Sequence, residues 1–557
     1  MLTETVTNRL EKKTYQLSGK PLALGDFAVI AGHRPGLGIE LDHSAAARVS
    51  ASWRAVDKAV KDGKVVYGLT TGFGGMANQA VDCHFAGDLQ NNLISFLAAG
   101  AGNPIDSRHV RGAMALRANV LLQGCSGIRF ELIERLVQFL QADAIPVVRE
   151  LGSIGASGDL VPLSAIARAI TGIQGKALVR MGGETIECRE ALERLELDPI
   201  ELLPKEGLAL VNGTSFSAAI AANAVSEARQ LFAVALAAQS MMLRALLVKD
   251  EPFEGFVHDL KPHPGQVWIA EVMRYLLRDG CQDLQVASDL VQDRYSLRCL
   301  PQYLGSIFEG LARIQHTVET EMNSVSDNPL VDPENGQFYQ SGNFLGQYVG
   351  MAMDDLRKYF GLTAKHLDVQ IASLVTPEFS GGLPASLRGN DTLANNMNMG
   401  LKGLQITGNS IMPMLTWFGN PLVDHFPTHA EQFNQNINGL SWGASQAAWK
   451  SVELFQSYLS ISLIFAVQAL DLRAKQVFGD FDGRRLLGTL PVQLYTSVCK
   501  LLDHEPGPQK PFLFNDSDRW LEEDVESICE SLSQGGPIVE SVQPILQSFD
   551  QKMRSGS

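Results

Sequence analysis

Residues 215–248 read SFSAAIAANAVSEARQLFAVALAAQSMMLRALLV, and this stretch decides the fold class. Its apolar and small residues recur at mixed spacings of three and four, which is the period of an α-helix. Gln239, Ser240 and Arg244 interrupt the most apolar part, so the stretch predicts a buried core helix rather than a membrane span. A helix that is apolar on most of its faces must be covered by other helices.

The same periodicity appears in five further segments: 109–123, 129–143, 306–323, 344–374 and 443–472. One subunit rarely covers so much apolar helix surface, so the sequence predicts a mainly α protein whose long-helix bundle is shared in a homo-oligomer. Short strand-like pieces at 64–67, 177–181 and 185–188 add a smaller α+β region near the N-terminus. We therefore expect an N-terminal region at 1–205, a central long-helix bundle at 206–480 and a C-terminal helical cap at 481–557.

Charge and cysteine content narrow the class of protein. The chain has 46 lysines and arginines against 61 aspartates and glutamates, and its formal net charge of −15 disfavours nucleic acid or an anionic membrane as a partner. Its seven cysteines are odd in number and form no CxxC pair, which predicts neither a zinc site nor a disulfide framework. The N-terminal residues lack the apolar stretch of a signal peptide, so we expect a cytoplasmic protein.

The segment Leu151–Leu163, LGSIGASGDLVPL, stands out because the common catalytic motifs are absent: there is no Walker P-loop, GxGxxG, HExxH or GxSxG. One interpretation of the segment is a flexible loop that ends in Asp159 as a helix N-cap. The other is chemical. Small side chains around Ser157 permit a tight bend in which the Gly158 nitrogen attacks the Ala156 carbonyl carbon, and loss of water would leave a methylidene electrophile.

This segment resembles the GSxGASGDLxPL motif of the aromatic amino acid ammonia-lyases and aminomutases, which it matches at residues 152–163. The resemblance extends from about residue 20 to the C-terminus. It implies a 4-methylidene-imidazol-5-one group formed from Ala156, Ser157 and Gly158, with no metal and no diffusible cofactor. It also implies a homotetramer with each active site assembled from three subunits.

Two further motifs supply candidate catalytic residues. The segment VYGLTTGFGG holds Tyr67, which matches the family's catalytic tyrosine, and its role would be to remove a proton from the substrate β-carbon. A phenol is a weak base near pKa 10, so we expect neighbouring positive charge and hydrogen bonds to lower that pKa. The segment LVNGTS holds Asn212, which resembles the family asparagine that hydrogen-bonds the prosthetic group. Taken alone, both segments would be interpreted as turns.

The segment QDRYSLRCLPQ supplies Gln292, Tyr295 and Arg298, which would share one face if it is helical. Arg298 offers a planar donor pair for the substrate carboxylate, and the alternative is a surface ion pair. By resemblance, Tyr295 joins the catalytic set. The further residues that the resemblance places near the substrate are Asn343, Phe344, Lys402, Glu431, Asn434 and Gln435, with Glu431 receiving the substrate ammonium. Core packing is the alternative for Phe344. Asn323 and Asp327 lie in a family segment that we expect to be structural.

Selectivity follows from the ring end of the pocket. Phe96 and Leu97 stand where tyrosine-specific members carry a histidine first, and Leu208 extends the same apolar wall. An apolar wall leaves a buried phenol hydroxyl without a partner, which costs roughly 1–3 kcal/mol. Histidine-specific members carry a glutamate where this chain has Gln435.

The resemblance therefore implies an aromatic amino acid substrate and the deamination of L-phenylalanine to trans-cinnamate and ammonia. A tyrosine-preferring lyase and a 2,3-aminomutase remain as alternatives. A catalytically inactive helical scaffold is a further alternative, of a different class. The Tyr67 segment and residues 100–107 would be the mobile lids.

Overall fold

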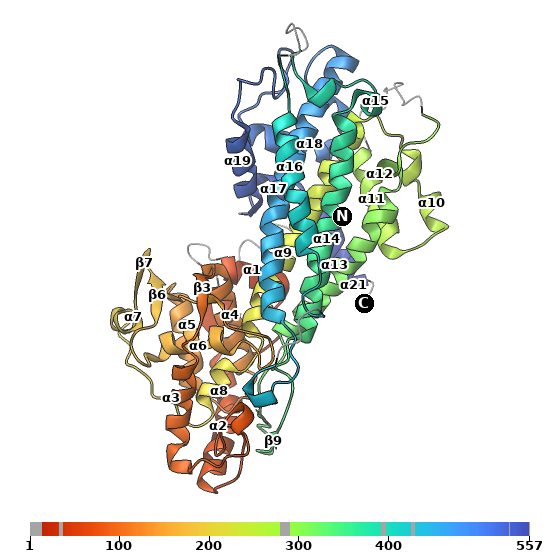
Figure 1. The fold of residues 1–557 in the computed structure, drawn as a ribbon. Coiled ribbons are helices and arrows are strands. Elements are labelled where there is room, and N and C mark those ends of the chain that lie inside the picture. Colours follow the sequence, from red (N-terminus) through yellow and green to blue (C-terminus); the bar gives the residue numbers. More distant parts are fainter. Residues whose placement is uncertain are drawn as a thin grey trace. The chain divides into compact units, whose positions relative to one another are not determined.

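The computed structural model describes residues 14–32, 37–278, 290–390, 397–424, 429–533 and 535–555 (Figure 1). The chain forms two compact units, one made of Met1–Ser226, Ile314–Asp354 and Pro421–Trp449, and the other of Glu227–Arg313, Asp355–Asn420 and Lys450–Ser557. They are called unit 1 and unit 2. The division of the sequence into three consecutive regions stays a prediction.

The fold is mainly helical, as predicted. The four longest helices each contribute residues to both units: α9 (Ser215–Ala245), α13 (Leu300–Met322), α14 (Gln347–Leu374) and α17 (Ser441–Phe478). They confirm four of the predicted long helices. The other two correspond to α4 (Ser107–Leu121) and α5 (Phe130–Gln141) in unit 1.

Unit 1 combines short helices with short strands. Its further helices are α1 (Leu24–Gly32), α2 (Ala46–Lys61), α3 (Ala86–Phe96), α6 (Leu160–Thr171), α7 (Cys188–Arg194) and α8 (Glu206–Val211). Its strands are β1 (Thr14–Leu17), β2 (Gly38–Leu41), β3 (Ala101–Pro104), β4 (Ile145–Pro146), β5 (Arg149–Leu151), β6 (Leu178–Met181), β7 (Glu184–Glu187), β8 (Leu330–Val331) and β9 (Phe338–Tyr339).

The strands of unit 1 pair in small sheets. β1 and β2 are parallel, whereas β3–β5, β4–β6–β7 and β8–β9 are antiparallel. The strands predicted at 177–181 and 185–188 are confirmed as β6 and β7. The strand predicted at 64–67 is wrong, because the chain closes into a turn there: Leu69 and Thr70 both donate backbone hydrogen bonds of 3.1 Å to the Val66 carbonyl.

Unit 2 is helical throughout its described part. Its further helices are α10 (Gly255–Asp259), α11 (Pro264–Leu277), α12 (Tyr295–Arg298), α15 (Pro377–Ser380), α16 (Lys402–Phe418), α18 (Thr489–Leu501), α19 (Leu521–Ser533), α20 (Pro537–Ser541) and α21 (Gln543–Ser555). Among the described helices, α17 alone is long and apolar enough to cross a membrane, and 83% of its most apolar window is buried in the structure. Core helices of globular proteins pass the same test.

The centre of unit 1 lies around α4, in which every residue from His109 to Leu121 is buried. This helix also carries charged and polar side chains into the core, including Arg111, Arg117 and Asn119. Buried polar groups are stable only when they are hydrogen-bonded. The Arg117 guanidinium is hydrogen-bonded to backbone carbonyls, one of which belongs to the candidate site residue Asn212.

Candidate active site

The Ala156-Ser157-Gly158 triad lies in the loop that joins β5 to α6. Gly155 and Gly158 adopt left-handed backbone conformations, with φ values of 63° and 66°. A Cβ on Gly158 would overlap the backbone of Gly213, and Asp159 donates a backbone hydrogen bond of 2.8 Å to the Gly213 carbonyl. Only glycine permits this contact between two backbones, which explains the small residues at this point.

Other segments of unit 1 hold the loop by its backbone. The Gly155 carbonyl accepts hydrogen bonds from the nitrogens of Gly346 at 3.2 Å and Gly439 at 3.3 Å. The Ile154 carbonyl accepts one from Leu440 at 3.1 Å. The interpretation of this segment as a flexible loop is therefore wrong, since partners almost 200 and 300 residues away fix its path.

Asp159 begins α6 but does not cap it with its side chain. Its carboxylate instead accepts hydrogen bonds from the Ser217 nitrogen at 2.7 Å, in the first turn of α9, and from the Ser153 hydroxyl at 3.1 Å. Asp159 therefore occupies the predicted N-cap position of α6, but the predicted capping hydrogen bond from its side chain is absent. Burial raises the pKa of Asp159 to about 6, and the hydrogen bonds from Ser217 and Ser153 oppose that rise.

Two amide side chains converge on Ser157. Asn212 donates a hydrogen bond of 3.0 Å to the Ser157 carbonyl, and Gln435 donates one of 2.9 Å to the Ser157 hydroxyl. The buried Asn212 Oδ1 atom has no hydrogen-bond partner in the described part of the chain. A buried, unsatisfied acceptor beside the triad fits a group that is formed there after folding, so Asn212 and Gln435 are the residues that would hold the methylidene-imidazolone.

Arg117 positions Asn212, a role that the motif search missed. Its guanidinium donates to the carbonyls of Asn212 at 3.1 Å and Ser326 at 3.0 Å, and also to the Ala209 carbonyl. Burial lowers the pKa of Arg117, while the Asp327 and Asp159 carboxylates oppose that change. A charged residue inside a predicted core helix was the available signal, because a buried charge needs fixed partners.

The segment that holds Asn323 and Asp327, which we expect to be structural, makes buried contacts within unit 1. Lys205 and Asp327 form a fully buried ion pair, with the Lys205 Nζ atom 2.9 and 3.0 Å from the two carboxylate oxygens. The Asn323 side chain accepts from the Leu22 nitrogen at 2.7 Å and donates to the Leu22 carbonyl at 3.0 Å.

Tyr67 lies half-buried in the turn that precedes Gly74. Its hydroxyl accepts a hydrogen bond of 3.1 Å from the Gly74 nitrogen. Burial raises the pKa of Tyr67, the Gly74 hydrogen bond opposes the rise, and the Glu431 carboxylate adds to it. The predicted lowering of this pKa is therefore not seen in one chain, because burial and an anion outweigh one hydrogen bond.

Glu431 approaches the same turn. A Cβ on Gly74 would lie 2.8 Å from the Glu431 carboxyl carbon, which places this acid beside the tyrosine segment. Glu431, Gln432 and Phe433 all have positive φ values, of 51°, 53° and 72°. Such backbone conformations are unfavourable for residues other than glycine and concentrate at functional sites.

The apolar wall is assembled around α3 and α8. The Gln90 side chain donates to the Gly68 carbonyl at 2.8 Å and accepts from the Leu208 nitrogen at 3.1 Å, which joins Leu208 to the Tyr67 turn. Leu97 and Leu208 are buried, and the Leu97 carbonyl accepts a hydrogen bond of 3.1 Å from Ser164 on α6. Phe96 differs, since the residue is 57% exposed in one chain.

Two predicted residues follow in the segment that leads to Gly346. Asn343 is exposed and donates a hydrogen bond of 3.3 Å to the Val325 carbonyl. Phe344 is half-buried and lies two residues before Gly346, whose nitrogen donates a hydrogen bond to the triad loop.

Asn434, three residues after Glu431, is exposed. Its backbone nitrogen donates a hydrogen bond of 2.9 Å to the Glu431 carbonyl.

The remaining predicted residues belong to unit 2. Tyr295 and Arg298 lie on α12, with the guanidinium carbon 4.8 Å from the centre of the tyrosine ring. Gln292 precedes the helix, so only Tyr295 and Arg298 can share the predicted helix face. Among the described residues no carboxylate pairs with Arg298, which argues against a surface ion pair, and its buried Nε atom has no hydrogen-bond partner. Lys402 is the exposed first residue of α16.

One group of side chains in the described residues has the spacing of a metal site. Asp82, Cys83 and His84 are exposed, and their ligand atoms lie within 4.8 Å of one another. Asp82 accepts from the His84 nitrogen at 3.0 Å, which is an ordinary cap of a short helix. Exposed acidic groups of this kind are common without an ion.

Comparisons with known proteins agree with the motif. A family model described as aromatic amino acid lyase matches residues 22–486. A phenylalanine ammonia-lyase of Nostoc punctiforme is 48% identical over 509 residues, covering 90% of this chain and 89% of that protein. An aromatic ammonia-lyase of Loktanella atrilutea is 39% identical over 545 residues, covering 96% and 99%. The solved structure of a Pantoea agglomerans phenylalanine aminomutase has a TM-score of 0.83 at 29% identity, covering 93% of this chain and 98% of that one.

Proposed function

The chain belongs to the aromatic amino acid lyase family of carbon–nitrogen lyases, and from this premise we propose that it is a phenylalanine ammonia-lyase. The reaction is the non-oxidative conversion of L-phenylalanine to trans-cinnamate and ammonia. The observation that carries the proposal is that Asn212 and Gln435 both donate hydrogen bonds to Ser157 in the triad loop.

The electrophile is formed from the chain's own residues. When present, the methylidene-imidazolone accepts electron density from the substrate and makes loss of ammonia possible. Ala156, Ser157 and Gly158 would form it, while Asn212 and Gln435 would hold it in place. Arg117 keeps the Asn212 backbone fixed during turnover, because its guanidinium bonds the Asn212 carbonyl.

The other residues bind the substrate and move a proton. Arg298 pairs with the substrate carboxylate through its planar donors. Glu431 accepts the substrate ammonium, and Tyr67 removes the β-proton. The Gly74 nitrogen bonds the Tyr67 hydroxyl, which favours the phenolate form. Since burial and Glu431 raise the Tyr67 pKa in one chain, we propose that a cation from another subunit lowers it.

A homotetramer is part of the proposal, and α16 supports it. Only Leu404, Gly408 and Leu415 are buried among the 17 residues of this helix. Its exposed side chains include Trp417, which is 73% exposed, as well as Ile406 and Met414. Large exposed apolar surfaces of this kind mark protein–protein interfaces. We also propose a cytoplasmic location, which the six free cysteines in the described residues support.

Selectivity for phenylalanine rests on the apolar wall. Leu97 and Leu208 are buried aliphatic side chains that offer no partner to a phenol hydroxyl. Leaving that hydroxyl unsatisfied costs roughly 1–3 kcal/mol, a factor of about ten to a hundred in favour of phenylalanine.

A 2,3-aminomutase is the second candidate, because a phenylalanine aminomutase shares this fold over almost the whole chain. An aminomutase returns ammonia to the β-carbon instead of releasing it. A tyrosine-preferring lyase is the third candidate, and it would give coumarate.

The test follows ultraviolet absorbance after purified protein is mixed with L-phenylalanine, L-tyrosine or L-histidine, with chromatography for β-amino acids. We expect cinnamate from phenylalanine in the largest yield, with ammonia released in equal amount. Ser157→Ala should give none, and Ser306→Ala, an exposed helical serine of unit 2, should behave as wild type. A β-amino acid as the main product would overturn the lyase in favour of the aminomutase.

A further inference from the structure

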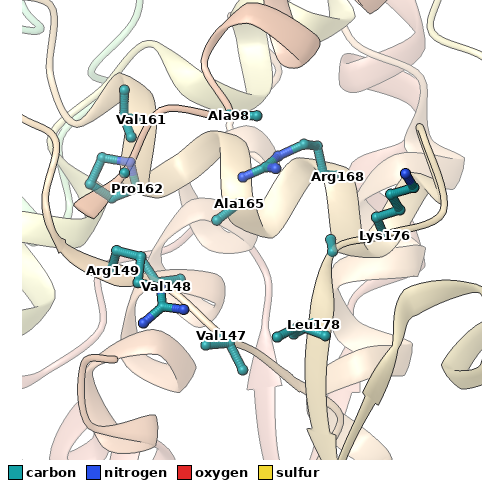
Figure 2. A pocket seen from close by; sticks show the side chains of 12 residues that line it. Ala98, Val147, Val148, Arg149, Val161, Pro162, Ala165, Arg168, Lys176 and Leu178 are labelled. Atoms are coloured by element: carbon teal, nitrogen blue, oxygen red, sulfur yellow. The ribbon is translucent and has the colours of Figure 1, made fainter. Parts of the chain in front are cut away.

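A pocket with a cavity of about 230 Å³ lies in unit 1 between α6, the β4–β5 segment and the chain that follows α3 (Figure 2). None of the predicted catalytic or substrate-binding residues lines it, although Gly100, the first residue of a predicted lid, does. At about 30 Å³ for each water molecule, the cavity has room for roughly eight waters, which is the size of a ligand with a single ring.

Three cations line this pocket: Arg149, Arg168 and Lys176. Among the described residues, no carboxylate pairs with any of them. Arg149 donates to the Gly102 carbonyl at 3.1 Å, and Arg168 makes one long bond of 3.4 Å to the Ser164 carbonyl. The chain as a whole has a net charge of −15, so three cations that line one cavity without a carboxylate partner stand out from the rest of the chain.

The rest of the lining is apolar. Val147, Ala165 and Leu178 lie between the cations in Figure 2, with Arg168 and Lys176 toward one side and Arg149 toward the other. Burial lowers the pKa of Arg168, which means that its charged form has lost solvation and gains from an anion. Aliphatic side chains together with a few charged ones are the usual lining of a small-molecule site.

We propose that this pocket binds a small aromatic carboxylate, with the carboxylate on Arg168 and Lys176 and the ring against Val147, Ala165 and Leu178. Guanidinium and ammonium groups are the donors that proteins use for carboxylates. The product of the proposed function belongs to this class of ligand, so the pocket is a second site for product. That last step rests on the proposed function, whereas the binding of an aromatic carboxylate does not.

Two residues that line the pocket also contact the triad loop. Val161 and Pro162 line the pocket and pack against Gly152, where a Cβ would lie 2.6 Å from a Val161 methyl carbon. The next residue, Ser153, donates to the Gly158 carbonyl at 3.2 Å and to the Asp159 carboxylate at 3.1 Å. A ligand that presses on Val161 therefore acts on the segment that carries Ser157, and occupancy should inhibit turnover.

The test is a calorimetric titration of the full-length protein with trans-cinnamate and with the neutral amide cinnamamide. In wild type we expect a binding event for cinnamate that weakens at least tenfold in Arg168→Gln/Lys176→Gln and that cinnamamide does not produce. Arg194→Gln is the matched control, because Arg194 is a surface arginine of the same unit paired with Glu184 and Glu190, and it should bind as wild type.

Cinnamate isotherms that are the same in wild type and in the double variant would overturn the site, and so would equal binding of the amide. If the double variant fails to fold, Lys176→Gln replaces it, since Lys176 is exposed, and a loss of at least threefold is expected. The titration involves no turnover, so it can succeed even when no cinnamate is produced from phenylalanine. Inhibition by cinnamate should contain a non-competitive part in wild type that the double variant loses.

Discussion

The loop that carries Ser157 and the helix α16 differ in how far the rest of the chain covers them. The loop is held by hydrogen bonds from Gly346, Gly439 and Leu440, all within the same unit. Helix α16 leaves most of its surface exposed, including Trp417. The hydrogen bonds that fix the loop therefore come from one chain, whereas α16 exposes apolar surface that the proposed homotetramer would cover.

The same contrast divides the candidate site residues. Asn212 and Gln435 have direct bonds to Ser157 in one chain. Tyr295 is 74% exposed, and the Nε atom of Arg298 has no partner. The residues around Ser157 thus have their hydrogen-bond partners within one chain, whereas in the proposed homotetramer Tyr295 and Arg298 would gain partners from another subunit.

Substitution of Ser157 should have the largest effect, because it removes the source of the electrophile. Ser157→Ala should lower kcat for phenylalanine by roughly a thousandfold or more while leaving the thermal unfolding midpoint within a few degrees. Steady-state ultraviolet assays and thermal melts of the purified variant check both expectations. Activity within tenfold of wild type would show that the loop has a structural role only.

Asp159 tests the burial of the triad loop through the pH dependence of the free energy of unfolding. Its pKa is raised from 3.8 to about 6, so the folded protein holds this proton to a higher pH than the unfolded chain does. The stability from this group is complete below about pH 4 and is lost as pH rises through about 6.

Asp159→Asn, which keeps an oxygen for the Ser217 nitrogen, should remove that loss. Relative to wild type, the variant should gain roughly 2 kcal/mol in the free energy of unfolding between pH 4 and pH 7. Urea unfolding at the two pH values measures the difference, and Asp57→Asn is the control, since Asp57 is half-buried on α2 and pairs with Lys61. A constant difference between variant and wild type would contradict the raised pKa of this buried carboxyl.

Arg298 tests the other side of the comparison. Arg298→Gln should lower kcat/KM for phenylalanine by about thirtyfold, roughly 2 kcal/mol, mainly through KM, because a charged hydrogen bond to the substrate is lost. Arg294→Gln is the matched control, since Arg294 lies four residues earlier and covers the Phe379 ring at 4.6 Å. Equal effects of the two variants would assign Arg298 to structure instead of binding.

Phe96 is expected to have the smallest effect. Phe96→His should raise the ratio of tyrosine to phenylalanine turnover by about tenfold, because the imidazole gives the phenol hydroxyl a partner. Phe85→His places the same change on a second exposed phenylalanine of unit 1 and should leave the ratio unchanged. An unchanged ratio in both variants would remove Phe96 from the ring end of the pocket.

The sequence predicted long elements well, because periodicity over many turns is a strong signal. Helices such as α9 and α17 follow the pattern of apolar residues closely. The strand predicted at 64–67 failed because a short apolar run has no periodicity to distinguish a strand from a turn. There the Thr70 hydroxyl, which accepts from the Val66 nitrogen at 3.0 Å, decided the local structure.

The site was predicted from motifs, and motifs do not show what supports them. The contacts of Gly439 and Leu440 with the triad loop join residues almost 300 positions apart, which no local pattern indicates. The direction of the Tyr67 pKa also needed the structure, since it depends on burial and on Glu431. Arg117 was visible in the sequence only as a charge in an apolar helix, and its three carbonyl partners gave it a role.

The central claim is that Ala156, Ser157 and Gly158 become an electrophile within one chain. The most direct measurement is the mass of the proteolytic peptide that contains residues 152–163, from wild type and from Ser157→Ala. Cyclisation and loss of the Ser157 hydroxyl predict a wild-type peptide lighter than its sequence by two water molecules, and a variant that lacks the loss from the serine. A wild-type peptide with the full mass of its sequence would contradict the account.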